Sequence, residues 1–160
     1  MRNRLRLLVA VAIAATALLP VSAQASSDSI RTARMDHANV MRILYSTPMD
    51  RFVAMARSGD PWLDWSTDFC SAPLVGTTGR SFDFHDACRR HDFAYRNLRL
   101  LEARYGTGGT YWNSATRRRA DELFLVDMRA HCSRRPWYEA PTCRGWADTF
   151  HRAVRIFGGP

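Results

Sequence analysis

A histidine and several carboxylates at helical spacing are the residues of this chain best suited to chemistry. Residues 84–97 read FHDACRRHDFAYRN, and a helix over them would place His91 in an apolar stripe with Asp92 beside it. The other members of that stripe are Phe84, Cys88, Tyr95 and Leu98. A second stripe, in residues 121–132, combines Asp121 with Phe124, Leu125, Met128 and Cys132. Each stripe therefore carries an inward polar side chain that can hold or transfer a proton.

An inward Asp121 needs a partner, because burying an unpaired carboxylate costs several kcal/mol. We expect it to accept a proton from one ring nitrogen of His91, which leaves the other nitrogen free as a general base for a hydroxyl or a water. The same pattern also fits a structural His–Asp pair that is buried for packing. The other histidines lack a carboxylate in a matching stripe and are predicted to be surface or packing residues: His37, His85, His131 and His151.

A loop carboxylate is predicted to join this site. Asp68 lies in TDFC, and a bond between Cys70 and Cys88 would hold it close to Asp92 and His91. Two carboxylates and main-chain carbonyls are hard oxygen ligands that suit Ca²⁺. Helix capping by Asp68 and a surface salt bridge of Asp92 are the alternative roles. The cysteine link favours the metal site.

Helices must position these residues. We predict a long helix over about 83–104 and another from about 113 to 132, packed antiparallel because a short glycine-rich segment joins them. Further helices are predicted after Ser27-Asp28, after Thr47-Pro48 and over about 146–157, with loops over 61–83 and 133–145. The fold class is therefore all-α, a small disulfide-stapled helical bundle whose two long antiparallel helices carry the active site.

The N-terminus has the layout of a secretory signal peptide. MRNRLR supplies three arginines, residues 7–19 are apolar, and VSAQA offers a cleavage site after Ala25. The apolar run is shorter than the roughly 20 residues of a membrane-spanning helix, which argues against an anchor. We therefore expect residues 1–25 to be removed and residues 26–160 to form a single secreted catalytic domain.

Four cysteines lie in the expected mature chain, and in an exported protein an even number indicates disulfides. Three pairings are possible, and we favour the local pairs Cys70–Cys88 and Cys132–Cys143. A zinc site built on Cys88 and His91 is the alternative. It would need two more ligands, and an oxidising compartment favours disulfides over thiolates.

The chain is basic, with 23 Lys+Arg, all of them arginine, against 15 Asp+Glu and a formal net charge of +8. A basic exported protein is attracted to polyanions, which include anionic lipid surfaces and nucleic acids. The charge alone does not choose between these partners.

The motifs that carry the candidate site resemble a known family. TDFC at 67–70, CRRHDFAYRN at 88–97 and ADELFLVDM at 120–128 are similar to the bacterial and fungal secreted phospholipase A2 family, the prokaryotic phospholipase A2 group. The resemblance extends from about Phe52 to Gly158. A His-Asp dipeptide is common, whereas the Cys-x-x-His-Asp-x-x-Tyr-Arg-Asn run with its flanking cysteines is far more specific.

The resemblance implies roles for individual residues. His91 would activate water for attack on the sn-2 ester of a glycerophospholipid, Asp121 would orient His91, and Tyr95 would support the pair. The products would be a fatty acid and a lysophospholipid. The implied partner is phospholipid at a membrane or micelle surface, bound peripherally by a monomer, with no nucleic acid.

The resemblance also implies a calcium cofactor. Asp68 through its side chain and Phe69 through its main-chain carbonyl would ligate Ca²⁺, with Asp92 contributing directly or through water. The metal would hold the phosphate and stabilise the oxyanion. The family pattern implies the same two local disulfides. This chain departs from the pattern at Ala94, where many members have glycine, and in a longer, less polar loop over 71–84.

Three further expectations remain open at this point. An apolar lip for lipid entry would be formed by Trp62, Trp65, Phe69, Leu74 and Val75, with Arg80 near the headgroups, unless the tryptophans are core residues. An exported basic ribonuclease or other polyanion-acting hydrolase is the competing enzyme, and its activity would survive a chelator. A non-enzymatic module that binds membranes or cell walls is the third reading, and its function would survive His91→Ala.

Overall fold

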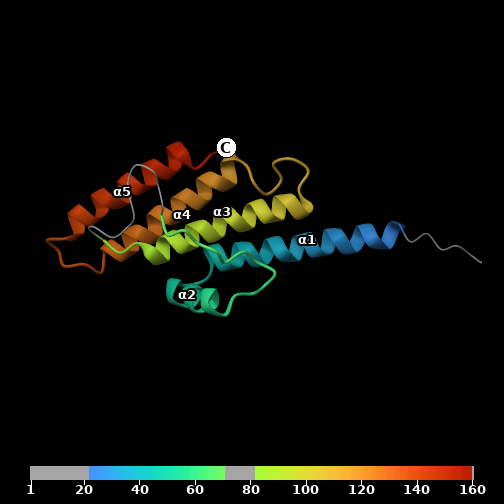
Figure 1. The fold of residues 1–160 in the computed structure, drawn as a ribbon, viewed down its shortest axis with the longest axis horizontal. Helices are drawn as coiled ribbons and strands as arrows, with labels where there is room; N and C mark the ends of the chain where they lie inside the picture. The colour runs from blue at the N-terminus through green and yellow to red at the C-terminus, as the bar shows by residue number, and fades with distance from the viewer. Residues whose placement is uncertain (1–21, 71–81, 160) are drawn as a thin grey trace, which may run out of the picture.

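The described part of the chain is entirely helical. In the computed structural model the described residues are 22–70 and 82–159, with side chains from residue 32 onward. The five helices of this part, drawn in Figure 1, are α1 (Ser22–Tyr45), α2 (Met49–Ser58), α3 (His85–Tyr105), α4 (Ser114–Cys132) and α5 (Ala140–Phe157). The predicted fold class is confirmed. The predicted signal peptide lies outside the described residues up to residue 21, and α1 begins at Ser22 rather than after the expected Ser27-Asp28 cap.

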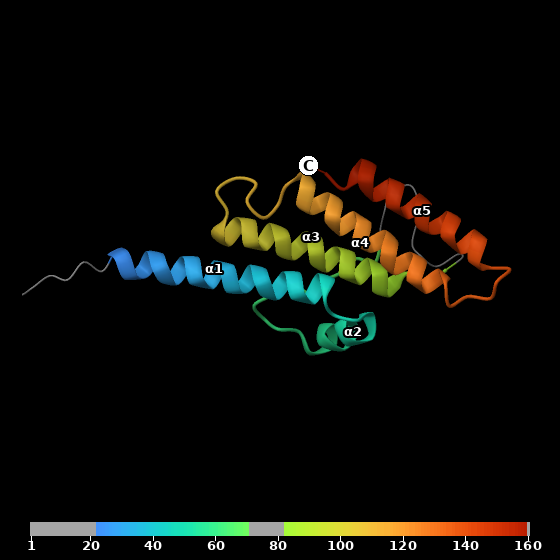
Figure 2. The ribbon, with the colours of Figure 1, turned by 180° about the vertical axis from the view of Figure 1, so that it is seen from behind.

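Helix α3 lies at the centre of the bundle. It contacts α1, α2 and α4, and α5 packs on α4. Figures 1 and 2 show α3 and α4 running in opposite directions, which is the predicted antiparallel arrangement, with α1 along the other side of α3. The two stripes that carry the polar residues therefore face each other.

Two apolar clusters fill the space around α3. The cluster toward α1 and α2 consists of Val40, Ile43, Leu44, Phe52, Leu63, Phe93, Ala94, Leu101 and Ala120. The cluster toward α4 and α5 consists of Phe84, Ala87, Cys88, Phe124, Met128, Cys132, Cys143, Ala147 and Phe150. Because these clusters bury α3 on both sides, its polar residues at mid-helix are held in a rigid setting.

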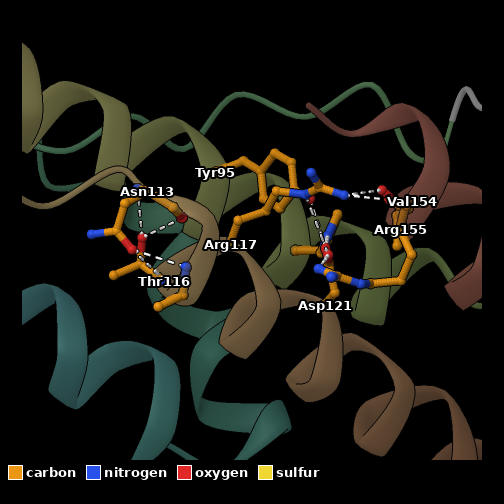
Figure 3. A network of polar contacts seen from close by, with 9 residues as sticks. Tyr95, Asn113, Thr116, Arg117, Asp121, Val154 and Arg155 are labelled. Atoms are coloured by element: carbon orange, nitrogen blue, oxygen red, sulfur yellow. Dashed lines mark hydrogen bonds and ion pairs between the residues drawn. The ribbon is translucent and has the colours of Figure 1, made fainter. Parts of the chain in front are cut away.

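The turn from α3 to α4 is organised by two side chains. The Glu102 carboxylate accepts hydrogen bonds from the backbone N–H groups of the turn, at Gly108, Gly109, Tyr111 and Trp112. Asn113 then caps α4 by accepting from the N–H groups of Ala115 (2.9 Å) and Thr116 (3.1 Å). The Thr116 hydroxyl accepts in return from the Asn113 N–H at 3.0 Å, which completes a capping box (Figure 3). The start of α4 is thus fixed one turn before Arg117 and two turns before Asp121.

Helix α5 begins earlier than expected. The sequence predicted a loop up to about residue 145, whereas the structure starts α5 at Ala140. Pro141 lies in the first turn, where its missing N–H costs nothing and its fixed φ suits a helix. The prolines and Gly145 of this segment predict a loop, and the predicted helix boundary is wrong. A Cβ added at Gly145 would meet nothing within 4 Å, so no close contact in the described residues requires glycine at this position of the helix.

The four cysteines form the two local pairs. Cys70–Cys88 joins the 61–70 segment to the first turn of α3, with the Cα atoms 5.4 Å apart. Cys132–Cys143 joins the end of α4 to the start of α5, with the Cα atoms 5.6 Å apart. Because Cys88 is bonded to Cys70, it cannot serve as a zinc ligand. The alternative zinc site on Cys88 and His91 is therefore excluded.

A buried charge pair links α3 to α4 away from the candidate site. Arg90 is 5% exposed, and its Nε lies 3.5 Å from Asp127 Oδ2, although neither atom has a hydrogen-bond partner. The guanidinium also lies over the Phe52 ring, 5.0 Å from its centre. Burial raises the pKa of Asp127 to about 6, although the positive charge of Arg90 lowers it in part. This pair costs desolvation energy and is a sensitive point for stability.

Among the helices of residues 22–70 and 82–159, none has the length and apolar character needed to cross a membrane.

Candidate active site

The structure brings His91 and Asp121 into contact between α3 and α4. His91 Nε2 lies 2.9 Å from Asp121 Oδ1, and the side chain of Asp121 is fully buried. An ionised carboxylate only accepts hydrogen bonds, so Nε2 carries a proton, and in the neutral imidazole Nδ1 is then the acceptor. An imidazole in this tautomer can take a proton through Nδ1 while Asp121 stabilises the resulting charge.

The His91 ring is held in place by two aromatic neighbours. The ring centre lies 4.3 Å from that of Tyr95 and 4.7 Å from that of Phe124. The Tyr95 hydroxyl donates to the same Asp121 oxygen at 2.6 Å. Tyr95 therefore both packs against the imidazole and fixes the carboxylate that orients it, which is the supporting position expected from the sequence.

Two arginines bind the other oxygen of Asp121. Arg155 of α5 donates from its guanidinium to Asp121 Oδ2 at 2.8 Å. Arg117 of α4, one turn before Asp121, places its Nε 3.6 Å from the same oxygen. Figure 3 shows the side chains of Arg117 and Arg155 meeting at the Asp121 carboxylate, with Tyr95 next to Arg117. The two oxygens of Asp121 thus have separate tasks, Oδ1 toward His91 and Oδ2 toward the arginines.

Arg117 also ties the end of α5 to this cluster. Its guanidinium donates to the main-chain carbonyls of Val154, at 3.4 Å, and Arg155, as Figure 3 shows. These carbonyls belong to the last turn of α5, where a cation is favoured by the helix dipole. Gly158, just after α5, packs closely on Tyr95, since a Cβ at this position would lie 2.6 Å from the Tyr95 hydroxyl oxygen. The C-terminal end of α5 therefore packs directly on the groups that hold Asp121.

The electrostatics of the cluster keep Asp121 ionised. Burial alone would raise the pKa of its carboxyl group, but the hydrogen bonds from His91, Tyr95 and Arg155 outweigh burial and lower the pKa. Burial and the adjacent Asp121 raise the pKa of Tyr95, so its hydroxyl stays protonated as a donor. Asp121 is consequently an acceptor at all of its contacts near neutral pH.

Asp92 holds the loop that precedes the Cys70–Cys88 disulfide. Its Oδ2 accepts from the Thr67 hydroxyl at 2.5 Å and from the backbone N–H of Asp68 at 3.1 Å. Burial raises the pKa of Asp92, the bond from Thr67 opposes that shift, and the charge of Asp68 adds to it. Asp68 itself is largely exposed and lies 3.8 Å from the Arg96 guanidinium. The predicted proximity of the two carboxylates is thus present.

The backbone between Asp68 and the disulfide adopts an unusual conformation. Phe69 and Cys70 have φ values of 52° and 59°, in the left-handed region that non-glycine residues rarely occupy. Such residues cost about 1–3 kcal/mol each and persist where the surroundings impose them. Here the disulfide holds Cys70, and the Thr67 hydroxyl accepts from the Phe69 N–H at 3.2 Å. The strained turn lies beside both carboxylates of the candidate metal site.

The donor set at this turn is compatible with calcium. It offers the carboxylates of Asp68 and Asp92 and the main-chain carbonyl of Phe69, all hard oxygen ligands. No group of three or more His, Cys, Asp or Glu side chains that could hold a metal is found in residues 22–70 and 82–159. Because Ca²⁺ takes six to eight oxygens, these groups would leave most positions to water or a ligand. A cation would also relieve the repulsion between the two carboxylates, which adds to the effect of burial in raising the pKa of Asp92.

A cavity of about 300 Å³ connects these elements. Its polar end is formed by His91, Asp68 and Asp92, with Tyr95 and the Cys70–Cys88 pair alongside. Its apolar wall comes mainly from α5 and consists of Phe124, Phe150, Ala153, Val154 and Phe157. Arg99 and Gly158 complete the lining. The cavity therefore combines a proton acceptor, a carboxylate pair and a hydrocarbon-like surface.

The tryptophans of the expected lipid lip have different environments. Trp65 packs against the core, with its ring centre 4.5 Å from that of Phe93, so for Trp65 the core alternative is confirmed over the lip. Trp62 is half-exposed, but its indole N–H donates to Asp36 and Arg104 covers its ring, outside the cavity lining. Leu74, Val75 and Arg80 lie outside the described residues.

Phe69 and His85 lie next to each other at the edge of the site. Their ring centres are 5.2 Å apart, and Arg89 covers the Phe69 ring. His85 also pairs with Asp83 at 2.8 Å, a carboxylate contact that the stripe pattern did not reveal. Both side chains of that pair are more than half exposed, so it is a surface pair.

Sequence reasoning missed Arg117 and Arg155. Arg117 precedes Asp121 by four residues, and this spacing on one helix is a usable signal for an ion pair. Arg155 had no such signal, because its meeting with Asp121 depends on how α5 lies across α4.

Comparison with known proteins identifies the family. The family model for prokaryotic phospholipase A2 matches residues 40–158. A secretory phospholipase A2 of Beauveria bassiana is 32% identical over 90% of this chain and 70% of its own length. A secretory phospholipase A2 of Arthroderma benhamiae is 28% identical over 96% of this chain and 97% of its own length. The chain belongs to the prokaryotic phospholipase A2 family and is a phospholipase A2 enzyme.

Proposed function

We propose that this chain is a secreted, calcium-dependent phospholipase A2 that hydrolyses the sn-2 ester of glycerophospholipids. The observation that carries the proposal is the His91–Asp121 pair, joined at 2.9 Å, at the polar end of a cavity with an apolar wall. A phospholipid has the matching character, with an ester next to both a phosphate and an acyl chain. The free Nδ1 of His91 is the group that would meet a water molecule in this cavity.

In the proposed reaction His91 acts as the general base. Water held at Nδ1 gives up a proton as its oxygen forms a bond to the sn-2 carbonyl carbon. Asp121 accepts the hydrogen bond from the Nε2–H group throughout the reaction and stabilises the imidazolium. When the bond between the carbonyl carbon and the glycerol oxygen breaks, His91 returns the proton to that oxygen, and a fatty acid and a lysophospholipid result. Tyr95, Arg117 and Arg155 keep Asp121 in the orientation that this exchange requires.

We propose that Asp68, the Phe69 carbonyl and Asp92 hold Ca²⁺. The hard oxygen donors, the rigid left-handed turn at Phe69 and the repulsion between the two carboxylates support this assignment. When bound, the cation would supply positive charge for the phosphate and for the oxyanion at the ester carbonyl. The Cys70–Cys88 disulfide would hold the ligand turn against α3 next to His91.

Secretion of the mature chain is part of the proposal. It is supported by the signal-peptide pattern in residues 1–25 and by the word "secretory" in the names of both relatives. Residues 26–160 would then be the single catalytic domain, and it would act as a monomer that binds peripherally to membranes or micelles. The partner we propose is phospholipid rather than nucleic acid, since the apolar wall of the cavity matches an acyl chain.

The proposal is tested by fatty-acid release from mixed phosphatidylcholine–phosphatidylglycerol micelles. The mature protein is assayed in excess Ca²⁺ and then in excess EGTA, with His91→Ala as the mutant. We expect release in Ca²⁺, loss of release in EGTA and recovery when Ca²⁺ is restored. Release that continues in EGTA would remove calcium from the mechanism. Absence of release by folded protein in Ca²⁺ would refute the proposed reaction.

A further inference from the structure

Arg99 is a cavity-lining residue that the proposed reaction does not use. It lies on α3 two turns beyond His91, and its side chain lines the same cavity as His91, Asp68 and Asp92. It is the one arginine or lysine in the lining formed by the described residues. Arg99 therefore brings a positive charge to the lining of this cavity.

The guanidinium of Arg99 is held by stacking. Its central carbon lies 4.6 Å from the ring centre of Trp112 and 5.7 Å from that of Tyr95. The Tyr95 ring is itself fixed, because its hydroxyl donates to Asp121, and the backbone of Trp112 is held in the turn because its main-chain N–H donates to Glu102 at 3.2 Å. Stacking uses the faces of a guanidinium and leaves its N–H edges free to donate. Arg99 is therefore preorganised as a donor.

The charge of Arg99 is not balanced by a carboxylate. The neighbouring arginines have acidic partners, Arg96 with Asp68 at 3.8 Å and Arg155 with Asp121 at 2.8 Å. Across residues 32–70 and 82–159, Arg99 forms no ion pair or hydrogen bond, only the two ring contacts. A positioned cation that lines a cavity without a protein partner is suited to an anionic ligand.

The position of Arg99 relative to His91 fits one phospholipid molecule. The Tyr95 ring lies between them, with its centre 4.3 Å from the His91 ring centre and 5.7 Å from the Arg99 guanidinium carbon. Because both distances are short, a lipid whose ester lies at His91 can extend its phosphate-bearing end to Arg99. The apolar residues of α5 lie in the same cavity for the acyl chain.

We infer that Arg99 binds an anionic oxygen at the phosphate-bearing end of the substrate and thereby sets substrate affinity. This inference rests on the proposed phospholipase function. Arg99 can bind the phosphodiester oxygen that all these lipids share. Alternatively, it can respond to the net negative charge of a lipid whose headgroup carries no cation. The choice between these two sources is made by comparing a zwitterionic with an anionic lipid.

The experiment uses the mature protein with Arg99→Gln and dispersed short-chain phosphatidylcholine and phosphatidylglycerol in excess Ca²⁺. Arg104→Gln is the matched control, because Arg104 lies on the same helix and stacks on Trp62 at 4.4 Å, outside the cavity. We expect Arg99→Gln to raise KM about tenfold with a smaller change in kcat, which is the loss of one charge-assisted hydrogen bond. Arg99→Lys should recover part of the loss, because it restores the charge but not the stacked planar donor, whereas a purely structural role would not be rescued by charge.

The outcomes separate the possibilities. An equal rise in KM for both lipids assigns the contact to the shared phosphodiester, and a rise confined to phosphatidylglycerol assigns it to the uncompensated lipid charge. The inference is overturned if Arg99→Gln matches Arg104→Gln on both lipids, if kcat falls without a change in KM, or if Arg99→Lys recovers nothing. Wild-type protein that hydrolyses neither lipid would instead refute the proposed function itself. Melting temperatures of all variants check that each one is folded.

Discussion

The substitution Arg155→Met tests whether the arginine cluster holds Asp121. Asp121 is fully buried, and Arg155 is its closest arginine partner, with 2.8 Å between Arg155 Nη1 and Asp121 Oδ2. Methionine keeps an unbranched apolar stem and removes the guanidinium. The carboxylate would then retain its bonds from His91 and Tyr95 and the more distant Arg117.

The structure sets the size of the expected loss. A hydrogen bond to a charged group contributes about 1.5–3 kcal/mol, and breaking a fully buried ion pair costs about 3–5 kcal/mol. The Arg155 side chain is 33% exposed, and Arg117 remains 3.6 Å from the same oxygen. Both facts place the stability loss expected for Arg155→Met in the lower of these two ranges. We expect the free energy of unfolding to fall by about 2 kcal/mol at pH 7.

The loss should depend on pH in a defined direction. Burial raises the pKa of Asp121, but its hydrogen bonds outweigh burial and lower the pKa below the ordinary value. A carboxyl group with a lowered pKa stabilises the fold above its unfolded pKa of about 4 and loses that contribution as pH falls through its folded pKa. Arg155 acts on the ionised form, so the deficit of Arg155→Met should be full at pH 7 and smaller at about pH 3.

Urea unfolding at pH 7 and pH 3, followed by tryptophan fluorescence, measures both effects. Arg152→Met is the matched control, because Arg152 is an exposed arginine on the same helix. It should change the free energy of unfolding by less than about 0.5 kcal/mol. Equal losses for the two variants, or a deficit of Arg155→Met that is the same at both pH values, would refute the assignment of Arg155 to Asp121.

Two further predictions concern stability and the loop. Arg90→Met should lower the free energy of unfolding by about 3 kcal/mol at pH 7 and by less at pH 5. The loss is smaller at pH 5 because burial raises the pKa of Asp127 to about 6, so that a proton neutralises the unpaired carboxylate. Urea unfolding at both pH values tests this, and an equal loss at the two would contradict it. Replacing Cys70 and Cys88 by alanine should weaken Ca²⁺ affinity about tenfold or more, since the strained turn at Phe69 loses the disulfide that holds it. Calorimetric titration with Ca²⁺ measures the affinity. An unchanged affinity in folded protein would show that the disulfide does not hold the turn.

The inward histidine and aspartate could be predicted because each interrupts a regular apolar stripe. His91 and Asp121 occupy positions that helical periodicity assigns to the core, and a buried carboxylate must have a partner. Asp68 and Asp92 could be placed near each other once Cys70 was linked to Cys88. These inferences needed only helix geometry and one covalent bond.

The remaining features depend on three-dimensional packing that periodicity does not describe. Arg155 reaches Asp121 only because α5 crosses α4 with its last turn over the carboxylate. The early start of α5 was hidden because Pro141 is a loop signal in most contexts and a good first-turn residue in this one. The stacking of Arg99 on Trp112 requires the turn that Glu102 organises through four backbone N–H groups, which no local pattern indicates.

The most direct test of the proposed mechanism is the position of the bond that is cleaved and its dependence on His91. Phosphatidylcholine with different labels in the sn-1 and sn-2 acyl chains is incubated with the mature protein in excess Ca²⁺, alongside His91→Gln. The wild type should release only the sn-2 chain as free fatty acid, and the variant should be about 10³-fold slower while remaining folded. Release of the sn-1 chain, or a variant as active as the wild type, would contradict the assignment of His91 as the base for sn-2 ester hydrolysis.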